Sequence, residues 1–189
     1  KTRSSAVDTS MARQWKEMGA DIPVTIAQAY ISAKRYTEAA AALEGLVAAN
    51  PDNMVYATNL ASIYVQSQKP DQAKAVYAKL MARPDLTAND MYMIGAGYYD
   101  LEDYRAAADV FKKTTQTAVK DRDAFEMWAR SVVLVSTKGG GTAAPEQLKE
   151  LVDATTGWTA LDPNSRIGLT LLTKALNDLN QGPKADRKS

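Results

Sequence analysis

Apolar and small residues recur along this chain at a fixed step of thirty-four residues. The step relates Tyr30 to Tyr64 and Tyr98, and an alanine follows each tyrosine nine residues later. These alanines are Ala39, Ala73 and Ala107, and a large apolar residue stands four positions after each one, as Leu43, Tyr77 and Phe111. Four residues before each tyrosine stand the pairs Ile26-Ala27, Leu60-Ala61 and Ile94-Gly95. A period of this length indicates stacked structural repeats.

Each copy of the repeat predicts two amphipathic helices. In the first copy, Ile26, Ala27 and Tyr30 lie on one stripe of a helix, because residues at i and i+4 share a face. Ala39 and Leu43 have the same spacing and define the stripe of a second helix. A small residue in each stripe lets the two helices approach closely, and the large one fills the space beside the contact.

Turn-forming residues are expected to separate these helices. We place the N-caps of the second helices at Thr37, Asp71 and Asp103, residue types whose side chains accept hydrogen bonds from free backbone N–H groups. The breaks between one helix pair and the next are predicted at Pro51-Asp52 and Pro84-Asp85.

The columns resemble the tetratricopeptide repeat, whose pattern is W-x2-L-G-x2-Y, then A-x3-F and then P. The matching segments are Leu60-Ala61-x2-Tyr64, Ile94-Gly95-x2-Tyr98, Ala39-x3-Leu43, Ala73-x3-Tyr77, Ala107-x3-Phe111 and Pro51. The tryptophan position departs from the pattern and holds Pro23, Ala57 and Met91. The resemblance is specific over residues 21–120 and implies an all-α, right-handed superhelical solenoid of antiparallel helix pairs.

Outside those residues the period continues less regularly. We predict an N-terminal segment (1–20), partly disordered, in which a helix around Trp15 could be the remnant of a preceding repeat. The repeats follow at 21–53, 54–87 and 88–120, then an irregular fourth repeat at 121–162 with a glycine loop at 136–144, a capping helix at 163–180 and a polar tail at 181–189. The capping helix is expected to present a polar outer face, as the last element of a stack must.

The amino-acid composition argues against several classes of function. The chain has 189 residues, 46% of them hydrophobic and 24% charged, which predicts a soluble globular domain. A formal net charge of +1, without clustered lysine or arginine, argues against nucleic acid or an anionic membrane as a partner. No apolar run is long enough for membrane insertion. The chain has neither cysteine nor histidine, so thiolate chemistry and the commonest metal ligand and general base are excluded.

The remaining polar clusters do not predict catalysis. The run Gly139 to Gly141 lacks the preceding strand and the following lysine of a phosphate-binding loop, so we interpret it as a flexible loop. The acidic residues Asp100, Glu102, Asp103, Asp121 and Asp123 lie where helix starts favour negative charge. We therefore expect no enzyme activity, no catalytic residue, no cofactor and no metal site.

The resemblance implies that the first helices line a concave face that holds an extended peptide or a partner helix. Its columns assign to this groove Gln28, Thr58, Asn59, Ser62, Gln66, Tyr92, Met93, Tyr99, Glu126 and Arg130, with Thr25, Ser32, Asn89 and Met127 beside them. Amide and hydroxyl groups can bond a peptide backbone, and the tyrosines and methionines offer soft apolar area. For Tyr92 and Tyr99, packing between helices is an equally good interpretation.

We therefore predict a non-catalytic scaffold that binds a peptide segment or a partner protein on its concave face. Two alternatives stay open: a self-association module that forms a homo-oligomer through the ends of the stack, and an accessory domain of a larger enzyme. The chain starts at Lys1, which we interpret as the start of a piece of a longer protein. A bacterial protein that is exported or periplasmic is favoured, with the cytoplasm left open.

Overall fold

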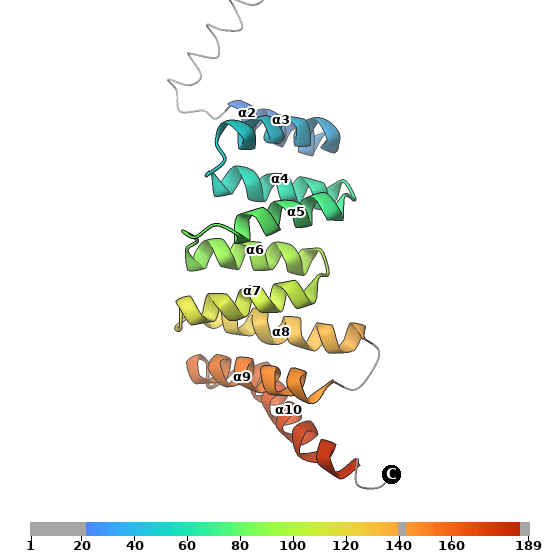
Figure 1. Ribbon diagram of the computed structural model, residues 1–189, viewed down its shortest axis with the longest axis vertical. Coiled ribbons are helices and arrows are strands. Elements are labelled where there is room, and N and C mark those ends of the chain that lie inside the picture. The colour runs from blue at the N-terminus through green and yellow to red at the C-terminus, as the bar shows by residue number, and fades with distance from the viewer. Residues whose placement is uncertain (1–21, 140–142, 186–189) are drawn as a thin grey trace, which may run out of the picture. The chain divides into compact units, whose positions relative to one another are not determined.

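The structure, a computed structural model, describes residues 22–139 and 143–185, without the side chains of residues 22–24, 28 and 181–185. This described part is helical and contains no strand (Figure 1). Its helices are α2 (Ile22–Ser32), α3 (Tyr36–Ala49), α4 (Met54–Gln66), α5 (Pro70–Met81), α6 (Ala88–Asp100), α7 (Tyr104–Thr117), α8 (Arg122–Lys138), α9 (Pro145–Leu161) and α10 (Arg166–Ala185). The predicted all-α class is confirmed. None of the described helices is long and apolar enough to cross a bilayer.

The chain divides into two compact units, Lys1–Leu80 and Met81–Ser189. The described part of the first unit comprises α2 to α4 and α5 up to Leu80, with α2 packed on α3 and α3 on α4. The second unit contains α6 to α10, and each helix packs on the next one along the chain. From α2 to α4 and from α6 to α10, helices that are neighbours in sequence are therefore neighbours in space, as a helical repeat requires.

The repeat columns form the core of both units. The alanines of the second helices, Ala39, Ala73 and Ala107, are all 0% exposed, and the large residues that follow them are buried as well. Ile26 departs from its column, because it is 43% exposed whereas Leu60 and Ile94 are buried. Ile26 lies on α2, and no described helix precedes α2 to cover it.

The fourth pair follows the same rule with a different spacing. Ala154 and Trp158 of α9 are 0% and 2% exposed and reproduce the small residue and the large residue four positions later. Ala154 stands 47 residues after Ala107 instead of thirty-four, so the sequence period did not identify it. Some of the extra residues lengthen both helices: α8 has 17 residues against 13 in α6, and α9 has 17 against 14 in α7.

The glycine loop predicted at 136–144 is shorter in the structure. Helix α8 continues through Ser136 to Lys138 and ends at its C-cap Gly139, because nothing between Val132 and Lys138 interrupts the helical backbone. Residues 140–142 lie outside the described part. Pro145 begins α9.

Two of the three predicted N-caps of the second helices are displaced. Asp103 is the N-cap of α7, and its side chain accepts a hydrogen bond from the N–H of Ala106 at 3.4 Å. Helix α3 has Arg35 as its N-cap, so Thr37 lies inside the first turn. Helix α5 starts at Pro70, which places Asp71 inside its first turn too. The turn before these helices is closed by the backbone, so a side-chain cap is not required.

A left-handed residue closes the turn within each of the first three pairs. In the second pair, the N–H of Gln68 donates to the carbonyl of Val65 at 3.1 Å, and the N–H of Lys69 donates to that of Tyr64 at 2.8 Å. The equivalent bonds recur in the other two pairs. The left-handed residues are Lys34 (φ 57°), Gln68 (φ 59°) and Glu102 (φ 54°), which share the thirty-four-residue step. A conformation that favours glycine is thus adopted three times by residues with side chains.

The last helix differs from its prediction in two ways. It extends to Ala185 instead of ending at residue 180. Its outer face is not uniformly polar: beside exposed polar residues, Ile167 is 54% exposed, and Leu169 and Leu176 are 44% exposed each. The segment predicted at residues 1–20, with Trp15, lies outside the described part, as do residues 186–189 of the tail predicted at 181–189.

Candidate functional site

The predicted groove residues of the second unit lie on α6 and α8, the first helices of their pairs. We call the partly exposed side chains of Tyr92, Met93, Glu126, Met127 and Arg130 the α6–α8 face. These positions stay partly exposed because α6 and α8 pack against their neighbours through other residues, such as Ile94 and Trp128, which are buried. The face therefore combines two methionines, a tyrosine and two charged groups.

Tyr92 takes part both in this face and in the packing below it. Its ring meets Phe111 of α7 edge-on, with ring centroids 5.4 Å apart and planes at 67°. Burial, and then the negative charges of Asp123, Asp121 and Glu126, raise the pKa of Tyr92. Its hydroxyl group thus lies near the acidic start of α8, and the side chain forms part of the wall between α6, α7 and α8.

The charged groups of the α6–α8 face neutralise one another. The carboxylate of Glu126 accepts hydrogen bonds from Arg130 Nε at 2.8 Å and from Arg122 at 3.1 Å. Arg122 also pairs with Asp123. The face consequently offers no free cationic cluster that could hold an anionic partner.

Tyr99 lies at the α6–α7 turn. Its ring packs edge-on against Tyr104, the first residue of α7, at a centroid distance of 5.3 Å. Lys138 Nζ is 5.3 Å from the centroid of the Tyr104 ring and binds the carboxylate of Glu102 at 3.0 Å. Tyr99 is therefore part of a cluster at the end of the helix pair.

In the first unit, the predicted groove residues lie on α4 and carry only neutral polar groups. Asn59, Ser62 and Gln66 are exposed, and Gln66 Nε2 donates to Ser62 Oγ at 3.4 Å. Thr58 is partly exposed, and its hydroxyl donates to the carbonyl of Met54 at 2.9 Å. Gln28 belongs to α2, but its side chain lies outside the described part.

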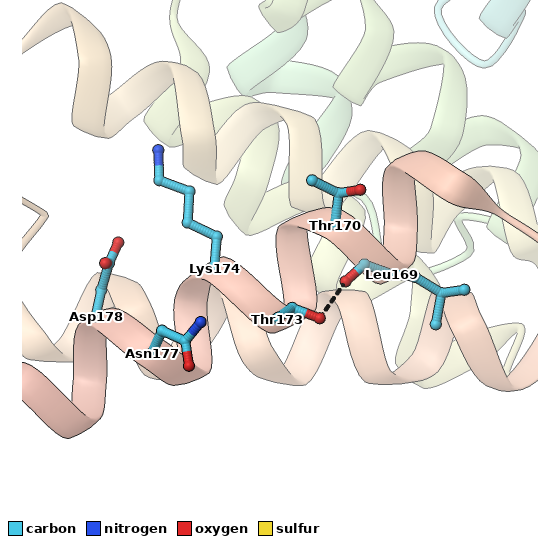
Figure 2. A pocket seen from close by; sticks show the side chains of 6 residues that line it. All are labelled: Leu169, Thr170, Thr173, Lys174, Asn177 and Asp178. Atoms are coloured by element: carbon cyan, nitrogen blue, oxygen red, sulfur yellow. Dashed lines mark hydrogen bonds between the residues drawn. The ribbon is translucent and has the colours of Figure 1, made fainter.

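Helix α10 presents a hollow surface that the sequence prediction did not include. The hollow has a volume of about 580 Å³ and is lined by Leu169, Thr170, Thr173, Lys174, Asn177 and Asp178 (Figure 2). The sequence could have aligned α10 with the first helices of the repeats. Helix α10 starts at Arg166, three residues after Pro163, just as α4 starts at Met54, three residues after Pro51. With this register, Thr170, Lys174 and Asp178 occupy the columns of Thr58, Ser62 and Gln66.

One further cluster of polar side chains forms hydrogen bonds between α7, α8 and α9. Arg105 binds the carboxylate of Glu150 through both of its terminal nitrogens, at 2.7 and 2.8 Å. Trp128 Nε1 donates to the same carboxylate at 3.0 Å. Burial disfavours the charge on Glu150, but these hydrogen bonds outweigh it and lower the pKa of Glu150. Because its groups bond one another, the cluster serves packing, and no group of acidic residues in the described part is arranged to hold a metal.

Comparison with known proteins agrees with this architecture. Residues 30–88 match the family model described as tetratricopeptide repeat. This match confirms, for these residues, the resemblance found in the sequence. No curated protein matches the chain.

Solved structures share the fold at low sequence identity. One crystal structure of MamA protein is 15% identical, with a TM-score of 0.55 over 88% of this chain and 91% of that one. A further MamA structure is 20% identical, with a TM-score of 0.52 over 90% of this chain and 94% of that one. These likenesses establish a common fold. The family itself consists generally of non-catalytic scaffolds for protein interaction, which supports the same broad class of function here.

Proposed function

We propose that this protein is a scaffold that binds a segment of another protein along the first helices of its repeats. The observation that carries the proposal is the α6–α8 face, where a tyrosine and two methionines stay partly exposed beside polar groups in one compact unit. Soft apolar side chains of this kind provide contact area for a peptide, and neighbouring polar groups bond its backbone.

Tyr92 and Met93 are the proposed anchors of the second unit. A few aromatic and large apolar side chains usually dominate the energy of an interface. Tyr92 is also held in place by its edge contact with Phe111, so little side-chain entropy is lost when a partner binds. In the first unit, Asn59 is exposed and its amide is the proposed contact to a peptide backbone.

Site-specific cross-linking tests this proposal. A photo-reactive amino acid at Met93 or Arg130 should capture a partner in cells, whereas the same group at Asp109 or Lys113 should not. The control positions are exposed on α7, a second helix of the same unit. Capture from the α7 positions alone would move the binding surface to the outer helices and refute the proposal.

Substitutions then measure the contribution of each anchor to a captured partner. Met93→Ala and Tyr92→Ala should each weaken binding by about 1–2 kcal/mol, which is roughly a five- to thirtyfold loss. Tyr92→Phe keeps the ring against Phe111 and therefore separates loss of the hydroxyl group from loss of packing. Asn59→Ala tests the first unit independently.

Salt gives a second criterion. Because Glu126 neutralises Arg130 and Arg122, affinity should change little between low and moderate salt. Binding that survives the removal of both Tyr92 and Asn59, yet is lost on raising the salt, would show that charged outer surfaces hold the partner.

A further inference from the structure

The start of α8, at one end of the α6–α8 face, carries more carboxylates than cations. Four carboxylates and two guanidinium groups gather there: Asp121, Asp123, Glu126 and Asp162, with Arg122 and Arg130. Four negative groups and two positive ones leave this set with a formal charge of −2. Asp90 at the start of α6 and Lys120 in the turn before α8 have opposite charges and do not change the balance. We call the four carboxylates the acidic border of the α6–α8 face.

One guanidinium group is shared among three carboxylates of the acidic border. Arg122 pairs with Asp123, with Glu126 at 3.1 Å and with Asp162 at 3.9 Å. The side chain of Asp123 nevertheless stays open to solvent, because it is 58% exposed, against 20% for Glu126. A carboxylate offers about four acceptor sites, so Asp123 can accept a second cation.

The hydroxyl group of Tyr92 senses the sign of the potential on the face itself. Burial is the first cause that raises the pKa of Tyr92, and the charges of Asp123, Asp121 and Glu126 raise it further, whereas Arg122 lowers it. Three groups that favour the neutral phenol therefore oppose one that favours the phenolate. The positive end of the α8 dipole amounts to about half an elementary charge, which is too little to offset a charge of −2.

Helical spacing places the open carboxylate beside an apolar side chain of the face. Asp123, Met127, Arg130 and Leu134 stand at i, i+4, i+7 and i+11, so they form one stripe along α8. Four residues of a helix rise by about 6 Å, which places Asp123 one turn from Met127. An extended chain advances by about 3.3 Å per residue. A cation and an apolar side chain a few residues apart in a bound segment therefore span this distance.

We propose that the segment bound on the α6–α8 face carries a lysine or an arginine within three residues of an apolar side chain. The apolar side chain lies on Met93 and Met127, and the cation lies on Asp123. This inference rests on the proposed function and adds the chemistry of the partner to it. An exposed ion pair contributes little affinity, so the cation selects among segments while the dependence on salt stays small.

Peptide selection on the full chain tests this chemistry without knowledge of the natural partner. A phage-displayed library of short random peptides is selected on the parent protein, and peptides that bind the uncharged double variant Met93→Asn/Met127→Asn equally well are discarded. The remaining peptides depend on the face. They should contain lysine and arginine at least twice as often as the library does, close to an apolar residue, and aspartate and glutamate less often.

Substitutions then test the assigned carboxylate with a selected peptide made by synthesis. Asp123→Asn should weaken its binding two- to fivefold, as the loss of one exposed ion pair does. Asp153→Asn is the matched control, because it removes the same charge from the exposed side of α9, a second helix of the same unit. It should leave the affinity unchanged.

The outcomes separate this inference from the proposed function. A selection without any face-dependent peptide would refute the proposed function, and this inference with it. Face-dependent peptides with no excess of cations, or a peptide that Asp123→Asn and Asp153→Asn affect equally, would overturn the partner chemistry alone. A tenfold gain of affinity in the full chain with Trp15→Ala would identify its own N-terminal segment as the occupant of the face and would also overturn the inference.

Discussion

A methyl group added at Gly157 tests the close packing of α8 on α9. A Cβ atom at this position would lie 2.1, 2.4 and 2.7 Å from three ring atoms of Phe125. Ordinary contact begins near 3.4 Å, so the ring has to move by more than an ångström. Replacing glycine by alanine in a helix contributes about 1 kcal/mol of stability, whereas overpacking costs about 1–3 kcal/mol. Three simultaneous clashes place the cost at its upper end, so Gly157→Ala should be destabilised by about 2 kcal/mol.

The assay is urea unfolding followed by tryptophan fluorescence. Trp128 and Trp158 are both buried in the second unit, and Trp158 is adjacent to the substitution. The third tryptophan, Trp15, is replaced by phenylalanine in all proteins compared, so that the signal reports on this unit. Thr156→Ala is the control, because it lies on the exposed side of the same helix and should gain about 0.5 kcal/mol from helix propensity alone. A Gly157→Ala protein as stable as the parent would show that α8 and α9 do not approach as closely as the structure indicates.

Three further substitutions test the turn, the buried tyrosine and the carboxylate between helices. Gln68→Gly should stabilise the first unit by about 0.5–1 kcal/mol in a thermal melt, because φ is positive there, while Gln66→Gly inside α4 should destabilise it by about 1 kcal/mol. Burial and the hydrogen bond to Glu44 raise the pKa of Tyr64 to about 12. The contribution of this hydroxyl group to the free energy of unfolding is therefore complete below about pH 10 and is lost as the pH rises toward 12. Tyr64→Phe should abolish that alkaline loss of stability. Because the pKa of Glu150 is lowered, the contribution of its carboxylate to the free energy of unfolding is present above about pH 4.3 and is lost as the pH falls through the lowered pKa. Glu150→Gln should therefore be less stable than the parent at pH 7 and equal to it in strong acid.

The groove prediction shows how much of a binding site the repeat alignment can predict. The columns correctly identified positions on first helices, since α4, α6 and α8 each contain them. They could not decide how exposed each side chain is. Tyr92 contacts Phe111, nineteen residues away in the chain, and Tyr99 contacts Tyr104 across a turn. Such contacts depend on how neighbouring helices are placed.

The irregular fourth pair marks the limit of the period itself. The step of thirty-four residues still places Trp128 and Ala129 in the columns of Ile94 and Gly95, but it no longer predicts the positions in α9. Ala154 and Trp158 still follow the same spacing, because a small residue beside a large one favours close contact between two helices. The spacing of four residues between the small and the large residue is therefore kept in α9, although the thirty-four-residue period is not.

The sequence by itself determined the helical class, the pairing of the helices and the buried alanine columns, because these depend on spacings of three to four residues and on one repeated step. Only the tertiary structure revealed the left-handed turns at Lys34, Gln68 and Glu102, the contact of Gly157 with Phe125 and the open face of α10. The physical reason is the same in each case. Backbone hydrogen bonds between particular residues, contacts between helices and the absence of a covering helix in the described part are properties of atoms brought together by folding, and no single helix pattern contains them.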